Sequence, residues 1–71
     1  MNLDLVKLGQ KIKFERIKRS ISQEQLAEFA DLSVHGLSNI ETGKSDIRYT
    51  NLLQLAKAFD MHVAELLTFE L

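Results

Sequence analysis

Residue types that support catalysis or metal binding are scattered in this sequence. The two histidines, His35 and His62, fall on different predicted elements, and the chain has no cysteine. Neither an H-E-x-x-H pattern nor a glycine-rich phosphate loop is present. Acidic pairs exist, but solvation explains them better in a chain of 71 residues without a pocket signal. We therefore expect no enzyme activity, no metal site and no cofactor, with His62 as a turn or cap residue.

Positive charge is the second chemical feature, and it gathers near the N-terminus. The formal net charge is −1, yet six of the nine lysines and arginines precede Ser20, against only Asp4 and Glu15. The six are Lys7, Lys11, Lys13, Arg16, Lys18 and Arg19. Such a run is typical of a solvated helix face. Beside a pair of capped helices, however, it favours contact with phosphate groups.

That helix pair is predicted between Ser22 and Lys44. Ser22 with Gln25 three residues later forms a capping-box pattern, and Ser33 repeats the N-cap for a second helix. The apolar positions Leu26, Ala27, Ala30, Leu37 and Ile40 follow a helical period. Asp31 stands where the turn between the helices requires a positive φ, and Gly43 ends the second helix. The pattern predicts two short helices joined by a tight turn.

Three further helices are predicted around this pair. Apolar residues at three- and four-residue steps indicate helices over about 3–19, 49–59 and 63–67, the last burying Leu66 and Leu67. No strand-like alternation of useful length occurs, so the fold class is all-α, a five-helix bundle in a single domain over 1–71. Phe14 and Phe29 are expected to be exposed or half-exposed.

Bulk properties limit the setting. A chain of 71 residues that is 45% hydrophobic has an apolar core that is only just sufficient, so a partner subunit would help it. The lack of cysteine fits a reducing cytoplasm, no segment is long and apolar enough to span a membrane, and the N-terminus does not resemble a secretory signal. We expect a cytoplasmic protein.

Four sequence pieces in a joint spacing carry a resemblance. They are S-Q-E-Q-L-A at 22–27, L-S at 32–33, L-S-N-I-E-T-G-K at 37–44 and L-L-Q-L-A-K-A-F at 52–59. From Leu8 to Leu67 the chain resembles the Cro/phage-repressor (xenobiotic-response-element type) helix-turn-helix family of bacterial and phage regulators. The resemblance implies a compact lambda-repressor-like DNA-binding domain whose second and third helices form the motif, at about 22–43.

The resemblance also implies that the second motif helix, about Val34–Thr42, enters the DNA major groove. Base-reading candidates on the face opposite Leu37 and Ile40 are Val34, His35, Ser38 and Asn39. Asparagine can bond an adenine in a bidentate manner, valine can meet a thymine methyl, and serine can bond several bases. Histidine can donate to a guanine or a phosphate. Because this helix has no lysine or arginine, A·T-rich contacts or shape reading are favoured over guanine readout.

Phosphate contacts are expected around the same helix pair. The candidates are Ser22, Gln23, Lys13, Gly36, Thr42, Lys44 and Arg48, with Gly36 allowing the helix to lie close to the DNA backbone. In the resembling family the positions of Arg16 and Glu41 form a structural salt bridge between the first helix and the end of the recognition helix. The alternative is that Arg16 is itself a phosphate ligand.

The function implied is sequence-specific binding of double-stranded DNA by a transcriptional regulator, expected to be a repressor acting as a homodimer on a two-fold operator. The last helix and tail, about 62–71, are the expected dimer contact, although their apolar residues could instead complete the core. An antitoxin with a toxin partner, or a restriction–modification controller protein, is the alternative within the same fold.

Overall fold

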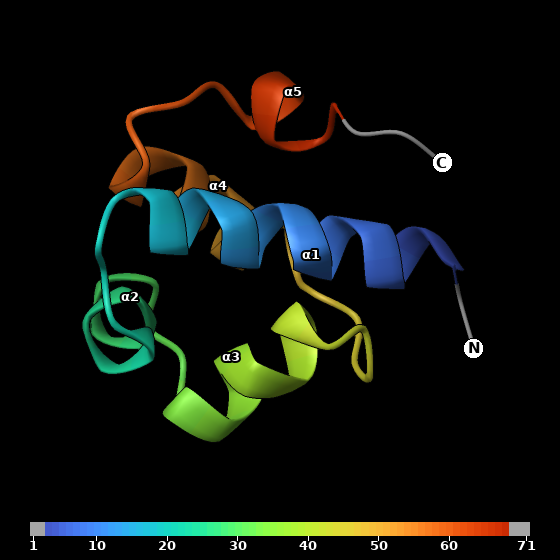
Figure 1. Ribbon diagram of the computed structural model, residues 1–71, viewed down its shortest axis with the longest axis horizontal. Helices are drawn as coiled ribbons and strands as arrows, with labels where there is room; N and C mark the ends of the chain where they lie inside the picture. Colours follow the sequence, from blue (N-terminus) through green and yellow to red (C-terminus); the bar gives the residue numbers. More distant parts are fainter. Residues whose placement is uncertain (1–2, 69–71) are drawn as a thin grey trace.

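The computed structural model describes residues 3–68, and within that range the chain folds into five α-helices and no strand (Figure 1). They are α1 (Leu3–Lys18), α2 (Gln23–Phe29), α3 (Val34–Glu41), α4 (Tyr49–Ala58) and α5 (Val63–Leu66). In Figure 1, α1 lies across the molecule with α2 and α3 on one side and α5 on the other. The all-α fold class is confirmed. No helix in the described part has the length and apolarity needed to cross a membrane.

The first four helices end in the same way. In each, the residue two places after the last helical residue has a left-handed backbone, with φ of 57° at Ser20, 57° at Asp31, 75° at Gly43 and 55° at Asp60. The next backbone N–H then bonds back to a carbonyl within the helix, as from Ile21 to Arg16 at 3.1 Å and from Leu32 to Ala27 at 2.8 Å. This is the Schellman motif, which satisfies carbonyls that a helix end would leave unpaired.

The cap residues explain why four predicted helices are one residue too long at the C-terminal end. Arg19, Thr42, Phe59 and Leu67 were expected inside their helices but lie just after them. Leu67 is also 44% exposed, so the prediction that it is buried is wrong, whereas Leu66 is fully buried. Successive residues on a helix point about 100° apart, and at this position Leu66 points to the core while Leu67 points outward.

The core joins side chains from every helix. Its buried apolar residues are Leu8, Ile12, Leu26, Ala27, Ala30, Leu37, Ile40, Leu52, Leu55, Ala56, Phe59 and Leu66. This set contains all five apolar positions predicted for the helix pair at 22–44, and Leu32, in the turn between the two helices, is half-buried against the core. Phe14 and Phe29 are 59% and 56% exposed, as expected.

Two glycines allow α1 to approach α3 closely. A Cβ on Gly9 would collide with the carbonyl oxygens of Ile40 and Glu41. A Cβ on Gly43 would lie 2.7 Å from the Cα of Val6, and Gly43 also needs its positive φ. The last turn of α3 therefore lies almost against the backbone of α1, and this contact fixes where α3 sits.

We predict that Gly9→Ala lowers the free energy of unfolding by about 2 kcal/mol or more, because the methyl group meets backbone that cannot move without separating α1 from α3. Urea unfolding followed by circular dichroism measures the change. Gly36→Ala is the matched control, since its Cβ meets only the side-chain oxygen of Ser33, at 3.0 Å. That variant should stay within about 1 kcal/mol of the parent, because alanine favours a helix by a similar amount. An equal loss of unfolding free energy in Gly9→Ala and Gly36→Ala would contradict the close approach of α1 to α3.

Candidate nucleic-acid interface

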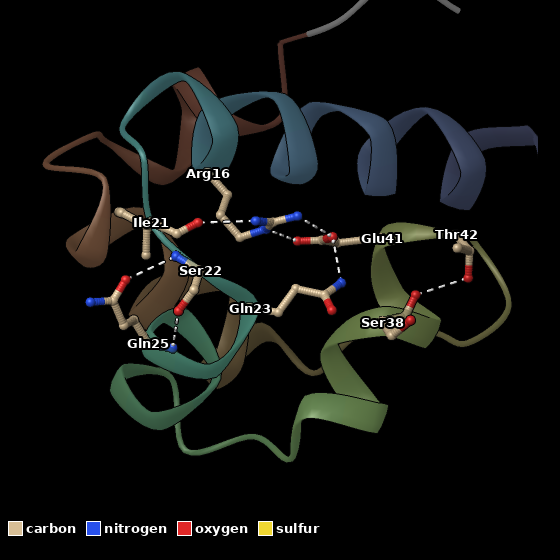
Figure 2. Close-up of polar contacts among 8 residues, drawn as sticks. All are labelled: Arg16, Ile21, Ser22, Gln23, Gln25, Ser38, Glu41 and Thr42. Carbon is tan, nitrogen blue, oxygen red and sulfur yellow. Dashed lines mark hydrogen bonds and ion pairs between the residues drawn. The ribbon is translucent and has the colours of Figure 1, made fainter.

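Two serine caps set the start of α2 and of α3. Ser22 Oγ accepts from the backbone N–H of Gln25 at 3.0 Å, and Gln25 Oε1 accepts from the N–H of Ser22 at 2.9 Å, which completes the capping box (Figure 2). Ser33 Oγ accepts from the N–H of Gly36 at 2.9 Å. Each hydroxyl keeps its own O–H as a donor after accepting these bonds. Both helices therefore begin at the residues that the sequence indicates.

The proposed base readers share the face of α3 that is turned away from the core. Leu37 and Ile40 are buried beneath the helix, whereas Val34 and His35 are exposed and Ser38 and Asn39 half-buried. A short helix with one apolar and one open face is what a groove-reading element needs. The structure thus brings the four candidates together, and their contact with bases stays a prediction.

Two of those readers also contact each other. Asn39 Nδ2 lies 3.4 Å from His35 Nε2, one helical turn away. This is a long hydrogen bond, and it forms only in the ring tautomer whose Nε2 carries no proton. The side chains of His35 and Asn39 are therefore neighbours on the open face of α3.

Arg16 and Glu41 form an ion pair across the domain. Arg16 Nε lies 2.7 Å from Glu41 Oε2 and Nη2 lies 3.2 Å from Oε1, a two-point contact that suits the planar guanidinium (Figure 2). Nη1 donates to the carbonyl of Ile21 at 3.0 Å, so Arg16 also fixes the connection between α1 and α2. Its side chain is only 12% exposed and that of Glu41 only 2%. The guanidinium of Arg16 is therefore occupied inside the protein, which disfavours the alternative role of Arg16 as a phosphate ligand.

Gln23 has a partner that sequence reasoning missed. Its amide nitrogen donates to Glu41 Oε1 at 3.0 Å, so one carboxylate accepts from residues of α1 and α2 while belonging to α3 (Figure 2). The two residues are 18 positions apart, and no local pattern relates them. Gln23 was predicted only as a phosphate contact, and the structure adds this internal bond to that prediction.

Gly36 and Thr42 have local structural explanations beside their proposed phosphate contacts. A Cβ at Gly36 would lie 3.0 Å from Ser33 Oγ, the atom that caps α3. Thr42 Oγ1 donates to the carbonyl of Ser38 at 2.9 Å, an oxygen that also accepts the backbone N–H of Thr42 at the helix end (Figure 2). Neither contact excludes a role at DNA, and for both residues that role stays a prediction.

The remaining cationic candidates lie on the surface. Lys13, Lys44 and Arg48 are exposed, Lys44 directly after the turn at Gly43 and Arg48 at the N-cap of α4. Arg48 makes no side-chain capping bond to that helix.

Four cations of the basic N-terminal run contact carboxylates within the domain. Glu15 is only 3% exposed, and its carboxylate pairs with Lys11 at 3.1 Å, Lys18 at 3.8 Å and Arg19. Arg19 also donates to the carbonyl of Phe59 at 2.8 Å and lies over that ring, 5.0 Å from its centroid. Arg16 is held by Glu41. Four of the six cations thus have carboxylate partners, but they share only Glu15 and Glu41, so these contacts offset two of the four positive charges.

Within residues 3–68, only Lys7 and Lys13 of that run form no ion pair. Glu15, which pairs with Lys11, Lys18 and Arg19, was read from sequence only as a charge opposing them. The hydrogen bond from Arg19 holds the pKa of Glu15 below its ordinary value of 4.5, although burial acts in the opposite direction. Lys11 and Lys18 lower this pKa further.

Comparison with known proteins decides the family. A model of the helix-turn-helix family matches residues 12–66, which contain both capped helices and the apolar positions of α4. The chain belongs to the Cro/C1-type helix-turn-helix family.

Individual relatives agree with this. The chain is 34% identical over 59 residues to the competence pilus inhibition repressor of Acinetobacter baylyi, covering 83% of this chain and about half, 54%, of that protein. The restriction-modification controller protein C.AhdI from Aeromonas hydrophila superposes with a TM-score of 0.87 at 35% identity, covering 92% of this chain and 98% of that one. SinR, the master regulator for biofilm formation, was solved in complex with DNA. It matches with a TM-score of 0.77 at 31% identity, covering 86% of this chain and 98% of that chain.

This helix-turn-helix chain therefore carries the DNA-binding domain of a transcriptional regulator. Its family and structural neighbours are DNA-binding regulators rather than enzymes.

Acid should destabilise this helix-turn-helix domain partly through Glu15. Because the pKa of Glu15 is lower in the folded chain than in the unfolded one, its stabilisation is present above pH 4.5 and is lost as the pH falls through the folded value. Glu15→Gln should lose roughly 1–3 kcal/mol at neutral pH. It should also lose less further stability than the parent between about pH 5 and about pH 3. Unfolding in urea across this range measures both effects.

Glu28→Gln is the control, because Glu28 is exposed on α2. If the parent and Glu15→Gln lost the same unfolding free energy between about pH 5 and about pH 3, the role of Glu15 would be contradicted.

Proposed function

We propose that this protein is a cytoplasmic, sequence-specific repressor that binds double-stranded DNA as a homodimer on a two-fold operator. The observation that carries the proposal is the capped helix pair, which presents Val34, His35, Ser38 and Asn39 on the open face of α3. The repressor named among its relatives and the DNA complex of SinR support it.

The open face of α3 favours particular bases. Asn39 presents an amide that matches the two hydrogen-bonding groups of adenine in the major groove, and Val34, which is 39% exposed, supplies a methyl surface for thymine. Ser38 and His35 add groups that bond several bases. No lysine or arginine is present on α3, so A·T pairs should dominate the half-site.

Phosphate contacts would place α3 in the groove. Lys13, Lys44 and Arg48 are exposed cations, and Ser22 and Gln23 stand at the start of α2. Contacts of this kind orient the protein without reading sequence. Gly36 and Thr42 complete the proposed set on α3.

Dimerisation would complete the operator-binding unit. Leu67 is 44% exposed directly after α5, and Met61 and Val63 beside it are only partly buried against the core. The proposed contact also includes residues 69–71, which lie outside the described residues. A small domain that buries little apolar surface gains stability from such a contact.

A restriction–modification controller is the second candidate. The superposition on C.AhdI covers 98% of that chain and 92% of this one, so the similarity in fold extends beyond the DNA-binding motif. A controller would act through the same DNA interface, and its operator would lie beside genes of a restriction–modification system. The antitoxin alternative requires a bound toxin instead.

Selection of binding sites from random DNA should yield an A·T-rich sequence with two-fold symmetry. Its half-site centres should be about 10–10.5 base pairs apart, or a multiple of that, because two copies of α3 must face the same side of the duplex. Sedimentation of the protein with the selected DNA should give two chains per site. Recovery of unrelated sequences would contradict specific binding, and one chain per selected site would contradict the dimer.

Asn39→Ala should weaken binding at one base pair of each half-site by roughly 1–3 kcal/mol and relax the preference for adenine there. Titration of the variant against operators carrying each base at each position measures the change. Gln54→Ala, on the exposed surface of α4, is the control and should bind as the parent does. Unchanged discrimination at every position would remove Asn39 from the base-reading set.

A further inference from the structure

The side chain of Gln23 lies between a fixed carboxylate and solvent. Its Nε2 is 3.0 Å from Glu41 Oε1, and Arg16 holds both oxygens of that carboxylate at 2.7 and 3.2 Å. The Glu41 side chain is 2% exposed, whereas Gln23 is half-buried. The amide nitrogen of Gln23 therefore meets a buried group that Arg16 holds in place, while the residue as a whole stays partly exposed.

The chemistry of the carboxylate determines which way the amide must face. The oxygens of ionised Glu41 can only accept hydrogen bonds, so Gln23 has to turn its NH₂ group, and not its oxygen, toward them. The NH₂ group has two hydrogens, and the bond to Glu41 uses one of them. A second N–H donor remains on the same nitrogen.

A phosphate oxygen is also only an acceptor. An amide that rotates freely must give up that freedom to hold its nitrogen, and not its oxygen, toward an anion. An amide whose nitrogen is already fixed by Glu41 presents a donor in a defined place, so less conformational entropy is lost on binding.

We propose that Glu41 is a positioning residue for DNA binding, which holds the amide of Gln23 so that its second N–H can donate to an operator phosphate. Arg16 serves the same purpose one step removed, because it immobilises Glu41. The inference rests on the proposed function, in which Gln23 contacts a phosphate. It adds that this contact depends on the ion pair beneath it.

A purely structural role gives a different expectation. If the bond between Gln23 and Glu41 only stabilised the fold, the effect of Gln23 on DNA affinity would not depend on whether Glu41 is present. A double-mutant cycle distinguishes the two cases.

The cycle compares the parent, Gln23→Ala, the double variant Arg16→Met with Glu41→Leu, and the triple variant that combines all three changes. Apolar side chains of similar volume often replace a buried ion pair without loss of stability, so the double variant removes Glu41 without leaving Arg16 unpaired. Affinities for the selected operator are measured at one salt concentration, after circular dichroism has established that each variant is folded. Gln54→Ala is again the control.

Gln23→Ala should weaken binding roughly tenfold per half-site in the parent, as expected for one hydrogen bond to a charged group. The double variant should lose a similar factor, and the triple variant should bind no more weakly than the double. Equal losses from Gln23→Ala in both backgrounds, or a double variant that binds as the parent does, would overturn the inference while leaving the proposed function intact. A parent that binds no selected DNA would overturn both.

A second measurement needs neither a variant nor DNA. In the free parent, the side-chain NH₂ of Gln23 should give a clearly higher NMR order parameter than that of exposed Gln54, because Glu41 restricts it. Equal order parameters for Gln23 and Gln54 would overturn the inference even if the double variant failed to fold.

Discussion

The ion pair between Arg16 and Glu41 is the contact on which the arrangement of the DNA-binding helices depends. Its members come from the first helix and from the last turn of the third, and both are largely out of water. A carboxylate at 2% exposure is costly to bury unless donors surround it, and here the guanidinium of Arg16 and the amide of Gln23 supply three. Loss of either charge alone would leave the other buried without a partner, at a cost of roughly 3–5 kcal/mol.

The backbone has to bring those two side chains together, and glycine makes this possible. At Gly9 the first helix approaches the carbonyls of Ile40 and Glu41 so closely that no side chain fits. Gly43 then reverses the chain with a positive φ directly against Val6. The inward side of the third helix is thus fixed by backbone contact and by one ion pair. The side chains on its outward side take no part in these contacts.

Local features of the fold were predictable from sequence, whereas contacts between distant segments were not. The caps at Ser22 and Ser33 involve atoms only three residues apart, so a short pattern reveals them. Arg16 and Glu41 are 25 residues apart, and only the family resemblance suggested that they pair. Neither a short local pattern nor the family resemblance indicated the bond between Gln23 and Glu41.

Glu15 shows why burial in particular escapes local reading. Its neighbours Lys11, Lys18 and Arg19 stand at spacings of three and four, the same spacings that an exposed helix face displays. What buries this face lies elsewhere in the chain, since Arg19 reaches the carbonyl and the ring of Phe59, 40 residues away. The spacing of these residues is compatible with the ion pairs, but it does not reveal that Glu15 is buried.

The internal ion pairs of the first helix have a consequence for binding to DNA of arbitrary sequence. Affinity for DNA of arbitrary sequence comes almost entirely from cations that replace condensed counterions along the phosphate backbone. In this chain, with a net charge of −1, several cations are already committed to internal carboxylates. On the proposed function, binding to the bulk chromosome should then be weaker than six N-terminal cations alone would give, which leaves more of the protein to occupy the operator.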